Sequence, residues 1–224
     1  MDKEKLIRKF DNQSRVYEMR RKKQTERIWR EKLIGSAKGK VLEVAVGAGA
    51  NFHFYPPNVD VTAVDFSDAM LSKAKESAIA SNVQATFIQS DIESISFPEN
   101  SFDTIVSTLS FCGYEHPVKV LESFCRWCKP GGQILLMEHG LSSNRLIGSS
   151  QKIIEPIFLR IVGCHLDRNM ITIFQQSPIH IDHMERYKFN TVHLVWASPN
   201  KGRLGSTASA SISFPWAFRD TEEE

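Results

Sequence analysis

Two glycines and one aspartate carry the first chemical signal of the sequence. Gly47 and Gly49 follow an apolar run at residues 41–46, and a second apolar run at 59–64 ends in Asp65. Glycine lacks a Cβ and tolerates positive φ, so such a turn lets the backbone approach a ligand closely. A carboxylate at the end of the next strand can accept hydrogen bonds from ribose hydroxyls. The pattern predicts a nucleoside-containing ligand at one edge of an α/β sheet.

The hydrophobic pattern predicts strands and helices that would position these residues. Strands are expected at 41–46, 59–65, 85–89, 104–109 and 133–138, and helices at 68–80 and 117–128. Ser67 can cap the first of these helices, and the Lys-Pro-Gly-Gly sequence at 129–132 ends the second. Strands that alternate with helices imply a parallel sheet with helices on both faces. Ahead of the sheet, residues 3–34 are expected to form one or two helices that end at Gly35.

The pattern changes after the fifth strand. Helices are expected at 146–162, interrupted at Pro156, and at 168–176, capped by Asp167; strands are expected at 179–189 and 191–197. The two strands flank Asn190 and predict a hairpin that adds antiparallel strands to the sheet. His180 and His183 lie three residues apart on the first of these strands, so they are expected on opposite faces and not as a metal-binding pair.

The composition is that of a globular protein without a strong charge. The chain has 224 residues, of which 42% are hydrophobic and 24% charged, so it can bury one core. The net charge of +2 produces no global field that would recruit nucleic acid or anionic lipid. No apolar run approaches the ~18 residues of a membrane span, and the first residues lack a signal-peptide core. A cytoplasmic protein without an integral membrane segment is expected.

The four cysteines fit a reducing compartment. Cys125 and Cys128 have CxxC spacing, but no second pair completes a zinc site, and two cysteines that pack from a helix onto the sheet are expected rather than a redox pair. No metal site is predicted. Residues 199–224 are rich in Gly, Ser and Ala and are expected to be flexible, although three late aromatics are candidates for docking: Phe214, Trp216 and Phe218.

Four sequence blocks together resemble one known family. They are Leu-Glu-Val-Ala-Val-Gly-Ala-Gly at 42–49, Val-Asp-Phe-Ser at 64–67, Phe-Pro-Glu-Asn-Ser-Phe-Asp at 97–103 and Lys-Pro-Gly-Gly at 129–132. In this order they resemble the class I S-adenosylmethionine-dependent methyltransferases, particularly the small-molecule branch near the ubiquinone and menaquinone methyltransferases. The resemblance covers about residues 10–198. It implies a Rossmann-like α/β fold with a mostly parallel sheet, a C-terminal antiparallel hairpin and an N-terminal helical cover.

The resemblance also implies a division of the chain and a set of ligand contacts. The division is an N-terminal helical cover at 1–39, an S-adenosylmethionine-binding domain at 40–198 and a tail at 199–224. The implied cofactor contacts are Glu43, Ala45, Gly47, Gly49, Asp65, Phe66, Met70, Asp91, Ile92 and Ser107. Asp65 would hold the ribose, and Asp91 the adenine amine, with Phe66, Met70 and Ile92 along the ring. Asp91 has an alternative role, since it could cap the following turn.

Two residues are candidates for catalysis. His139 follows the fifth strand and could act as a general base, with a structural hydrogen bond as the equal alternative. Tyr17 belongs to a segment, Phe-Asp-x-x-Ser-x-x-Tyr at 10–17, that is similar to an N-terminal motif of the quinone branch. It could close over the cofactor, or it could simply be buried in the helical cover.

Two departures from glycine-rich patterns separate the possible functions. Phe52 stands where a nicotinamide-binding turn requires its third glycine, which argues against a nicotinamide-dependent oxidoreductase. Ala45 stands where the methyltransferase pattern has its first glycine. Its methyl group could crowd the methionine end of the cofactor, so a non-catalytic S-adenosylmethionine-binding protein remains a third candidate.

The leading hypothesis is an enzyme that methylates a small, apolar acceptor of the quinone, lipid or thiol class. Apolar residues at 153–162 could line the acceptor pocket, but packing in the core is the preferred interpretation, and Cys164 and His165 are candidates for the substrate wall. The Asn/Asp-Pro-Pro-aromatic signature of adenine and amide N-methyltransferases is missing after the fourth strand, so a nucleic-acid substrate is not expected. The sequence carries no signal for an oligomeric state.

Overall fold

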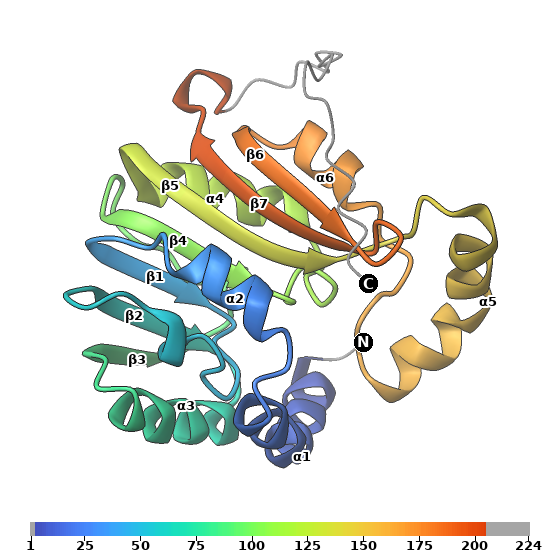
Figure 1. Ribbon diagram of the computed structural model, residues 1–224, viewed down its shortest axis with the longest axis horizontal. Helices are drawn as coiled ribbons and strands as arrows, with labels where there is room; N and C mark the ends of the chain where they lie inside the picture. The colour runs from blue at the N-terminus through green and yellow to red at the C-terminus, as the bar shows by residue number, and fades with distance from the viewer. Residues whose placement is uncertain (1–2, 205–224) are drawn as a thin grey trace.

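A seven-stranded sheet forms the centre of the computed structural model, which describes residues 3–204 (Figure 1). The strands are β1 (Lys40–Val44), β2 (Asp60–Asp65), β3 (Ala85–Gln89), β4 (Phe102–Thr108), β5 (Cys128–His139), β6 (Ile179–Tyr187) and β7 (Val192–Pro199). Their order is β3-β2-β1-β4-β5-β7-β6. The first five strands are parallel, and β7 runs antiparallel to both β5 and β6. The predicted mostly parallel sheet with a C-terminal hairpin is confirmed.

Helices cover both faces of this sheet. They are α1 (Lys3–Lys22), α2 (Arg27–Ile34), α3 (Asp68–Ala80), α4 (Pro117–Trp127), α5 (Arg145–Ile161) and α6 (Met170–Gln176). Helices α2 and α3 pack on one face, α4 and α6 on the other, and each pair encloses its own apolar cluster. The predicted cap of α3 is confirmed, since the hydroxyl of Ser67 accepts a hydrogen bond from the backbone N of Met70 at 3.1 Å.

The connection from β1 to β2 contains one short 3-10 turn, Phe52–Phe54, instead of a full helix. The ring of Phe52 is buried and packs edge-on against Phe87, with ring centroids 6.0 Å apart. It also occupies the space beside Gly49, where a Cβ would lie only 2.7 Å from the Phe52 ring. Phe52 therefore fills the core below the turn, and no helix approaches the strand as a third glycine would allow.

Two expected helix boundaries need correction. Pro156 does not interrupt α5, because that helix is largely exposed and solvent can satisfy the carbonyl of Lys152 that the proline leaves without a donor. Helix α6 starts two residues later than expected. Its cap is Asn169 and not Asp167, since the Asn169 side chain accepts from the backbone N of Thr172 at 3.1 Å.

Two irregularities in the sheet also change expected positions. Strand β5 starts at Cys128, and the following glycines lie in a register shift opposite β4, so only Cys125 of the CxxC pair lies on a helix. Strand β6 has a register shift between Ile181 and His183. An extra residue in one strand reverses the alternation beyond it. Both His180 and His183 are therefore exposed on the same face, contrary to the prediction.

Helix α5 is the element that departs furthest from expectation. The prediction that its apolar residues pack in the core is wrong for four of them, which are exposed: Ile153, Ile154, Ile157 and Ile161. Gly148 is the one buried residue of this helix. The physical reason is position: α5 lies outside both faces of the sheet, at the right of Figure 1.

Among residues 3–204, no helix combines the length and the apolar character needed to cross a bilayer. The expected docking of Phe214, Trp216 and Phe218 concerns residues outside the described part of the chain. The division of the chain at residues 39 and 198 stays a prediction.

Candidate functional site

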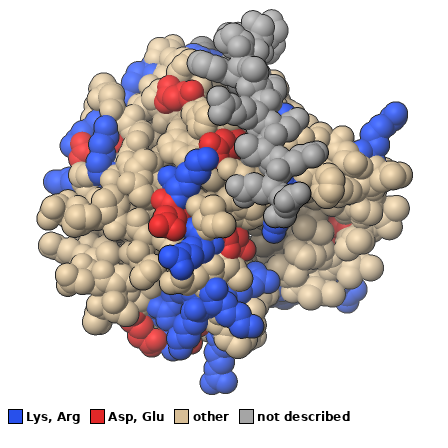
Figure 2. All heavy atoms as spheres, in the orientation of Figure 1, with Lys and Arg blue, Asp and Glu red and all other residues tan. Residues whose placement is uncertain are grey.

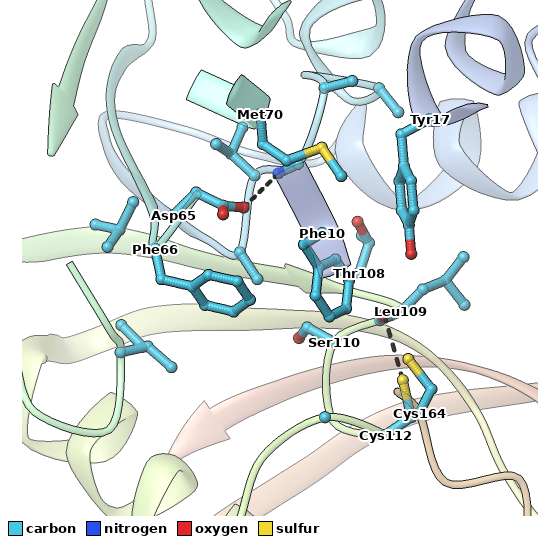
Figure 3. Close-up of a pocket in the computed structure, with 18 of the residues that line it drawn as sticks. Phe10, Tyr17, Asp65, Phe66, Met70, Thr108, Leu109, Ser110, Cys112 and Cys164 are labelled. Atoms are coloured by element: carbon cyan, nitrogen blue, oxygen red, sulfur yellow. Dashed lines mark hydrogen bonds between the residues drawn. The ribbon is translucent and has the colours of Figure 1, made fainter. Parts of the chain in front are cut away.

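A cavity opens at the carboxyl ends of β1 to β4, and α1 forms its outer wall (Figure 3). The position follows from the topology. The chain leaves β1 toward β2 and β3, and returns to place β4 on the other side of β1. Loops on the two sides of such a reversal diverge and leave a crevice, which is where open α/β sheets bind ligands.

The loop after β1 supplies one wall of the cavity. Ala45 and Gly47 both line it, with φ values of 48° and 54°. Gly49 also has positive φ, at 76°, but it is not a lining residue and contacts the core through Phe52. Only Ala45 carries a Cβ in this left-handed conformation, which costs an L-residue roughly 1–2 kcal/mol. The structure therefore places strain at the position where the sequence departs from the family pattern.

Asp65 is held at the end of β2 by two backbone donors. Its Oδ2 accepts from the N of Gly47 at 2.8 Å (Figure 3), and its Oδ1 accepts from the N of Ser67 at 2.9 Å. The residue is 7% exposed, and burial raises its pKa to about 6, a rise that the backbone donors oppose. A carboxylate has about four lone-pair sites, so Asp65 can still accept hydrogen bonds from a diol in the cavity.

A largely apolar slot lies beside Asp65. Phe66, Met70 and Ile92 all line the cavity, and the Phe10 ring of α1 packs edge-on against Phe66 with centroids 5.3 Å apart. Asp91 lines the same slot, forms an ion pair with Lys3 and accepts from the backbone N of Glu93 at 2.9 Å. Asp91 thus caps the following turn and also faces the cavity, so the two alternatives for it are compatible.

A buried polar network lies below the β1 loop. Glu43 does not line the cavity; it is 1% exposed and accepts from Asn51 Nδ2 at 2.9 Å and from the Tyr55 hydroxyl at 2.8 Å. Burial raises the pKa of Glu43 to about 7. Asn51 in turn accepts from Arg30 Nη1 at 2.6 Å, and both Arg30 and Thr108 line the cavity. Glu43 therefore acts on the cavity through Asn51.

Arg30 is a site residue that the sequence did not reveal. It is buried on α2, and its Nη1 donates to Thr108 Oγ1 at 3.2 Å, while its Nη2 lies 3.5 Å from Glu26. Its buried Nε has no hydrogen-bond partner among residues 3–204. A buried cationic donor without an acceptor is costly. Because Arg30 also lines the cavity, its positive charge suits an anionic group bound there.

Glu138, at the end of β5, holds the loop after β4. It accepts from Ser107 Oγ at 2.9 Å and from the backbone N of Ser110 and Phe111 at 2.9 and 3.1 Å. Burial raises the pKa of Glu138 to about 7. Ser107 is fully buried in this cluster and does not line the cavity, whereas Ser110 does. The structure thus places Ser107 among the groups that hold the loop.

The two candidate catalytic residues have different positions. Tyr17 lines the cavity from α1, and a Cβ at Gly47 would lie 3.8 Å from its Cδ1, so Tyr17 lies over the β1 loop. Burial raises the pKa of Tyr17 well above 10, so its hydroxyl stays protonated. His139 is not among the lining residues, and burial lowers its pKa, which keeps the imidazole neutral.

Two cysteines lie together at the end of the cavity opposite the Asp65 slot (Figure 3). The thiol of Cys112 donates to the carbonyl of Leu109 at 3.7 Å, and the backbone N of His165 donates to the carbonyl of Cys112 at 3.0 Å. Cys164 therefore lines the cavity, which is consistent with the prediction that it belongs to the substrate wall. The His165 side chain does not line the cavity.

His165 belongs to a group that could in principle hold a metal ion. Among residues 3–204, Glu155, His165 and Asp167 bring one ligand atom each within 4.8 Å of one another. His165 Nδ1 lies 2.7 Å from Glu155 Oε1, and the other Glu155 oxygen accepts from the backbone N of Leu166 at 2.6 Å. These hydrogen bonds account for the grouping without an ion.

Comparison with known proteins identifies the family. The methyltransferase domain family matches residues 41–132. A phosphatidylethanolamine N-methyltransferase of Cereibacter sphaeroides is 30% identical over 58% of this chain and 64% of its own length. A thiol S-methyltransferase of Rattus norvegicus is 32% identical over 71% and 63%. A ubiquinone/menaquinone biosynthesis C-methyltransferase of Pseudomonas putida is 28% identical over 61% and 57%.

The fold agrees with these matches. A geranyl diphosphate C-methyltransferase from Streptomyces coelicolor, solved with S-adenosyl-L-homocysteine, superposes with a TM-score of 0.64 over 78% of this chain and 79% of its own, at 12% identity. In sequence and in fold, the chain is similar to the class I S-adenosylmethionine-dependent methyltransferases. The resemblance to the ubiquinone and menaquinone branch is confirmed, S-adenosylmethionine is the cofactor that the assignment supports, and none of these proteins supports the oxidoreductase alternative. The chain spans less than two thirds of the length of the three relatives.

Ala45→Gly is expected to raise the free energy of unfolding by about 0.5–1 kcal/mol, because the substitution removes the Cβ from a left-handed residue. Ala48→Gly is the matched control: it lies in the same loop without positive φ and should destabilise the chain. Urea unfolding of the three proteins measures both effects. Equal destabilisation by the two substitutions would mean that Ala45 is not strained.

Glu138→Gln is expected to flatten the dependence of stability on pH. The folded carboxyl has a pKa of about 7, against 4.5 for a glutamate in water, so its contribution to stability is complete below about pH 4.5 and is lost as the pH rises through 7. Glutamine imitates the protonated acid, so the wild type should lose about 1–3 kcal/mol more than the variant between pH 5 and 8.

Urea unfolding at several pH values measures this difference, with Glu99→Gln at an exposed site as the control. The explanation fails if Glu138→Gln keeps the full pH slope of the wild type.

Proposed function

We propose that this chain transfers the methyl group of S-adenosylmethionine to a small, apolar acceptor of the quinone, lipid or thiol class. One observation carries the proposal. A single cavity joins a buried carboxylate, a buried arginine with an unpaired Nε and an end lined by apolar side chains and thiols. A sulfonium nucleoside, an amino acid carboxylate and an apolar acceptor need these three environments side by side.

The residues present fit the cofactor. The free lone pairs of Asp65 would accept the ribose hydroxyls, and Asp91 with Ile92 and Phe66 would receive the adenine. The positive charge of Arg30, which lines the cavity, would attract the carboxylate of the methionine end. Ala45 and Gly47 would contact the same end through their backbone. In this arrangement Glu43, Gly49 and Ser107 support the wall from behind.

The cofactor supplies an activated methyl group, which leaves sulfur as the acceptor's electron pair forms the new bond. The protein's part is alignment, and effective molarities of about 10⁵–10⁸ M show what alignment alone contributes. Tyr17 covers the β1 loop and keeps water from the reacting centre, while its protonated hydroxyl can donate but cannot act as a base. His139 does not line the cavity, so it would not take the proton that a thiol or quinol acceptor loses; such an acceptor would release that proton to water.

The relatives named above support the choice of acceptor class. By their names they act on phosphatidylethanolamine, on thiols and in ubiquinone or menaquinone biosynthesis. In this chain Leu6, Ile7 and Leu109 line the cavity together with Cys112 and Cys164, a wall that suits an apolar or thiol-bearing acceptor. Turnover of S-adenosylmethionine against quinol, thiol, amine and phospholipid acceptors tests the class. Binding without turnover across that panel would favour the non-catalytic alternative.

Asp65→Ala is expected to weaken binding of S-adenosylhomocysteine by about 1–3 kcal/mol, because charge-assisted hydrogen bonds to the ribose are lost. Isothermal titration calorimetry measures the change. Asp60→Ala is the matched control, since Asp60 starts the same strand at its exposed opposite end. Because Asp65 also holds Gly47 and Ser67, the unfolding temperature of each variant is measured alongside. Unchanged affinity would remove Asp65 from the site, and binding of NADH but not of S-adenosylmethionine would contradict the cofactor assignment.

A further inference from the structure

Helix α5 exposes five large apolar residues to solvent and turns two polar residues, Gln151 and Glu155, toward the protein, which is unusual for a surface helix. On the inner side, Gln151 Nε2 donates to the carbonyl of Gly140 at 3.1 Å, and Gln151 Oε1 accepts from the backbone N of Ser142 at 2.8 Å. Glu155, also on the inner side, is engaged with His165 and Leu166. These contacts fix the rotation of the helix about its axis, so the outward apolar face is a built feature.

The outer face carries an apolar stripe, which the exposed Ser150 interrupts between Leu146 and Ile153. Its residues are Leu146, Ile153, Ile154, Ile157 and Ile161, each between 49% and 84% exposed. Their spacings of three, four and seven residues place them on one side of the helix. At 1.5 Å per residue the stripe is about 22 Å long. Scattered exposed apolar residues are ordinary, but a stripe of this kind marks an interaction surface.

The exposed charges of α5 are all positive. Arg145, Lys152 and Arg160 are exposed, and none of the three side chains forms an ion pair within residues 3–204. In helical projection they lie along one edge of the stripe, which is the arrangement of helices that rest in the headgroup region of a bilayer. Figure 2 shows the surface over α5, at the right of the view, as largely uncharged with basic groups at its margin.

The C-terminal end of α5 is anchored close to the cavity. Lys9 of α1 donates to the carbonyl of Arg160 at 2.7 Å, and Gln13 Nε2 donates to the carbonyl of Val162 at 3.4 Å. Cys164, two residues further, lines the cavity. A surface that receives α5 would therefore lie near the apolar end of the cavity.

We propose that the outer face of α5 docks on an anionic lipid surface, with its five apolar side chains in the headgroup region and its three basic residues paired with lipid headgroups. A second copy of the chain is the less suitable occupant. A two-fold contact between α5 helices would bring like charges together, because both copies present the same basic edge. The proposal concerns a face outside the methyl-transfer site, so it does not depend on the proposed function.

The test uses flotation of the full chain with vesicles of phosphatidylcholine alone or with 30% phosphatidylglycerol. The wild type is expected to bind the anionic vesicles and to bind them less well at high salt. Ile153→Ser combined with Ile157→Ser should reduce binding about tenfold or more, and replacement of Arg145, Lys152 and Arg160 by Gln should abolish the preference for anionic vesicles. Ile79→Ser on α3 is the matched control, because Ile79 is 82% exposed away from α5.

Three results would overturn the proposal. They are no binding of the wild type to anionic vesicles, equal binding by the α5 variants, and vesicle binding that appears only when residues 205–224 are removed. In the third case the chain's own terminus covers the face. Calorimetry with S-adenosylhomocysteine on the same variants should show unchanged affinity, which separates failure of this proposal from failure of the cofactor assignment.

Discussion

A buried carboxylate needs hydrogen-bond donors, and in this chain the loops that form the cavity supply them. Glu43 is satisfied by Asn51 and Tyr55, and Asp65 by Gly47 and Ser67. A lost donor would leave a buried acceptor unpaired, at a cost of about 1–3 kcal/mol each. The requirement to satisfy these groups therefore ties each loop to the strand end beside it, so that the cavity wall is arranged before a ligand arrives.

The need to satisfy buried polar groups also explains why several residues expected to contact the cofactor do not line the cavity. Glu43 and Ser107 are polar residues in buried strands, so the sequence signals them clearly. In the fold, however, Glu43 accepts a hydrogen bond from Asn51, and Ser107 donates one to Glu138. Asp65 differs because its backbone donors leave lone pairs that face the cavity. A sequence pattern identifies a buried polar residue more readily than it identifies which side of that residue meets the ligand.

Much of the architecture follows from local signals in the sequence. The alternation of apolar strands with helices, the serine before α3 and the turn at Asn190 each have a local physical cause, and each is confirmed. What could not be predicted depends on contacts between distant segments. Arg30 looks like an ordinary basic residue on an N-terminal helix, and only the fold brings it to Asn51 and Thr108.

Helix α5 shows the opposite kind of error. Its strong apolar pattern predicted burial, but no other part of residues 3–204 covers that face. Periodicity states that one face of a helix is apolar, but it does not state what covers the face. The cavity has an apolar end, and the exposed apolar face of α5 lies beside that end. Both features suit an acceptor that is itself apolar.

We propose that the loops held by buried carboxylates form the cofactor site. Hydrogen–deuterium exchange with and without S-adenosylhomocysteine is the direct test of this proposal. We expect slower exchange in the loops at 45–51, 65–70 and 107–114 on addition of the ligand, and no change in α5. Protection confined to other segments, or the same protection from NADH, would contradict the account.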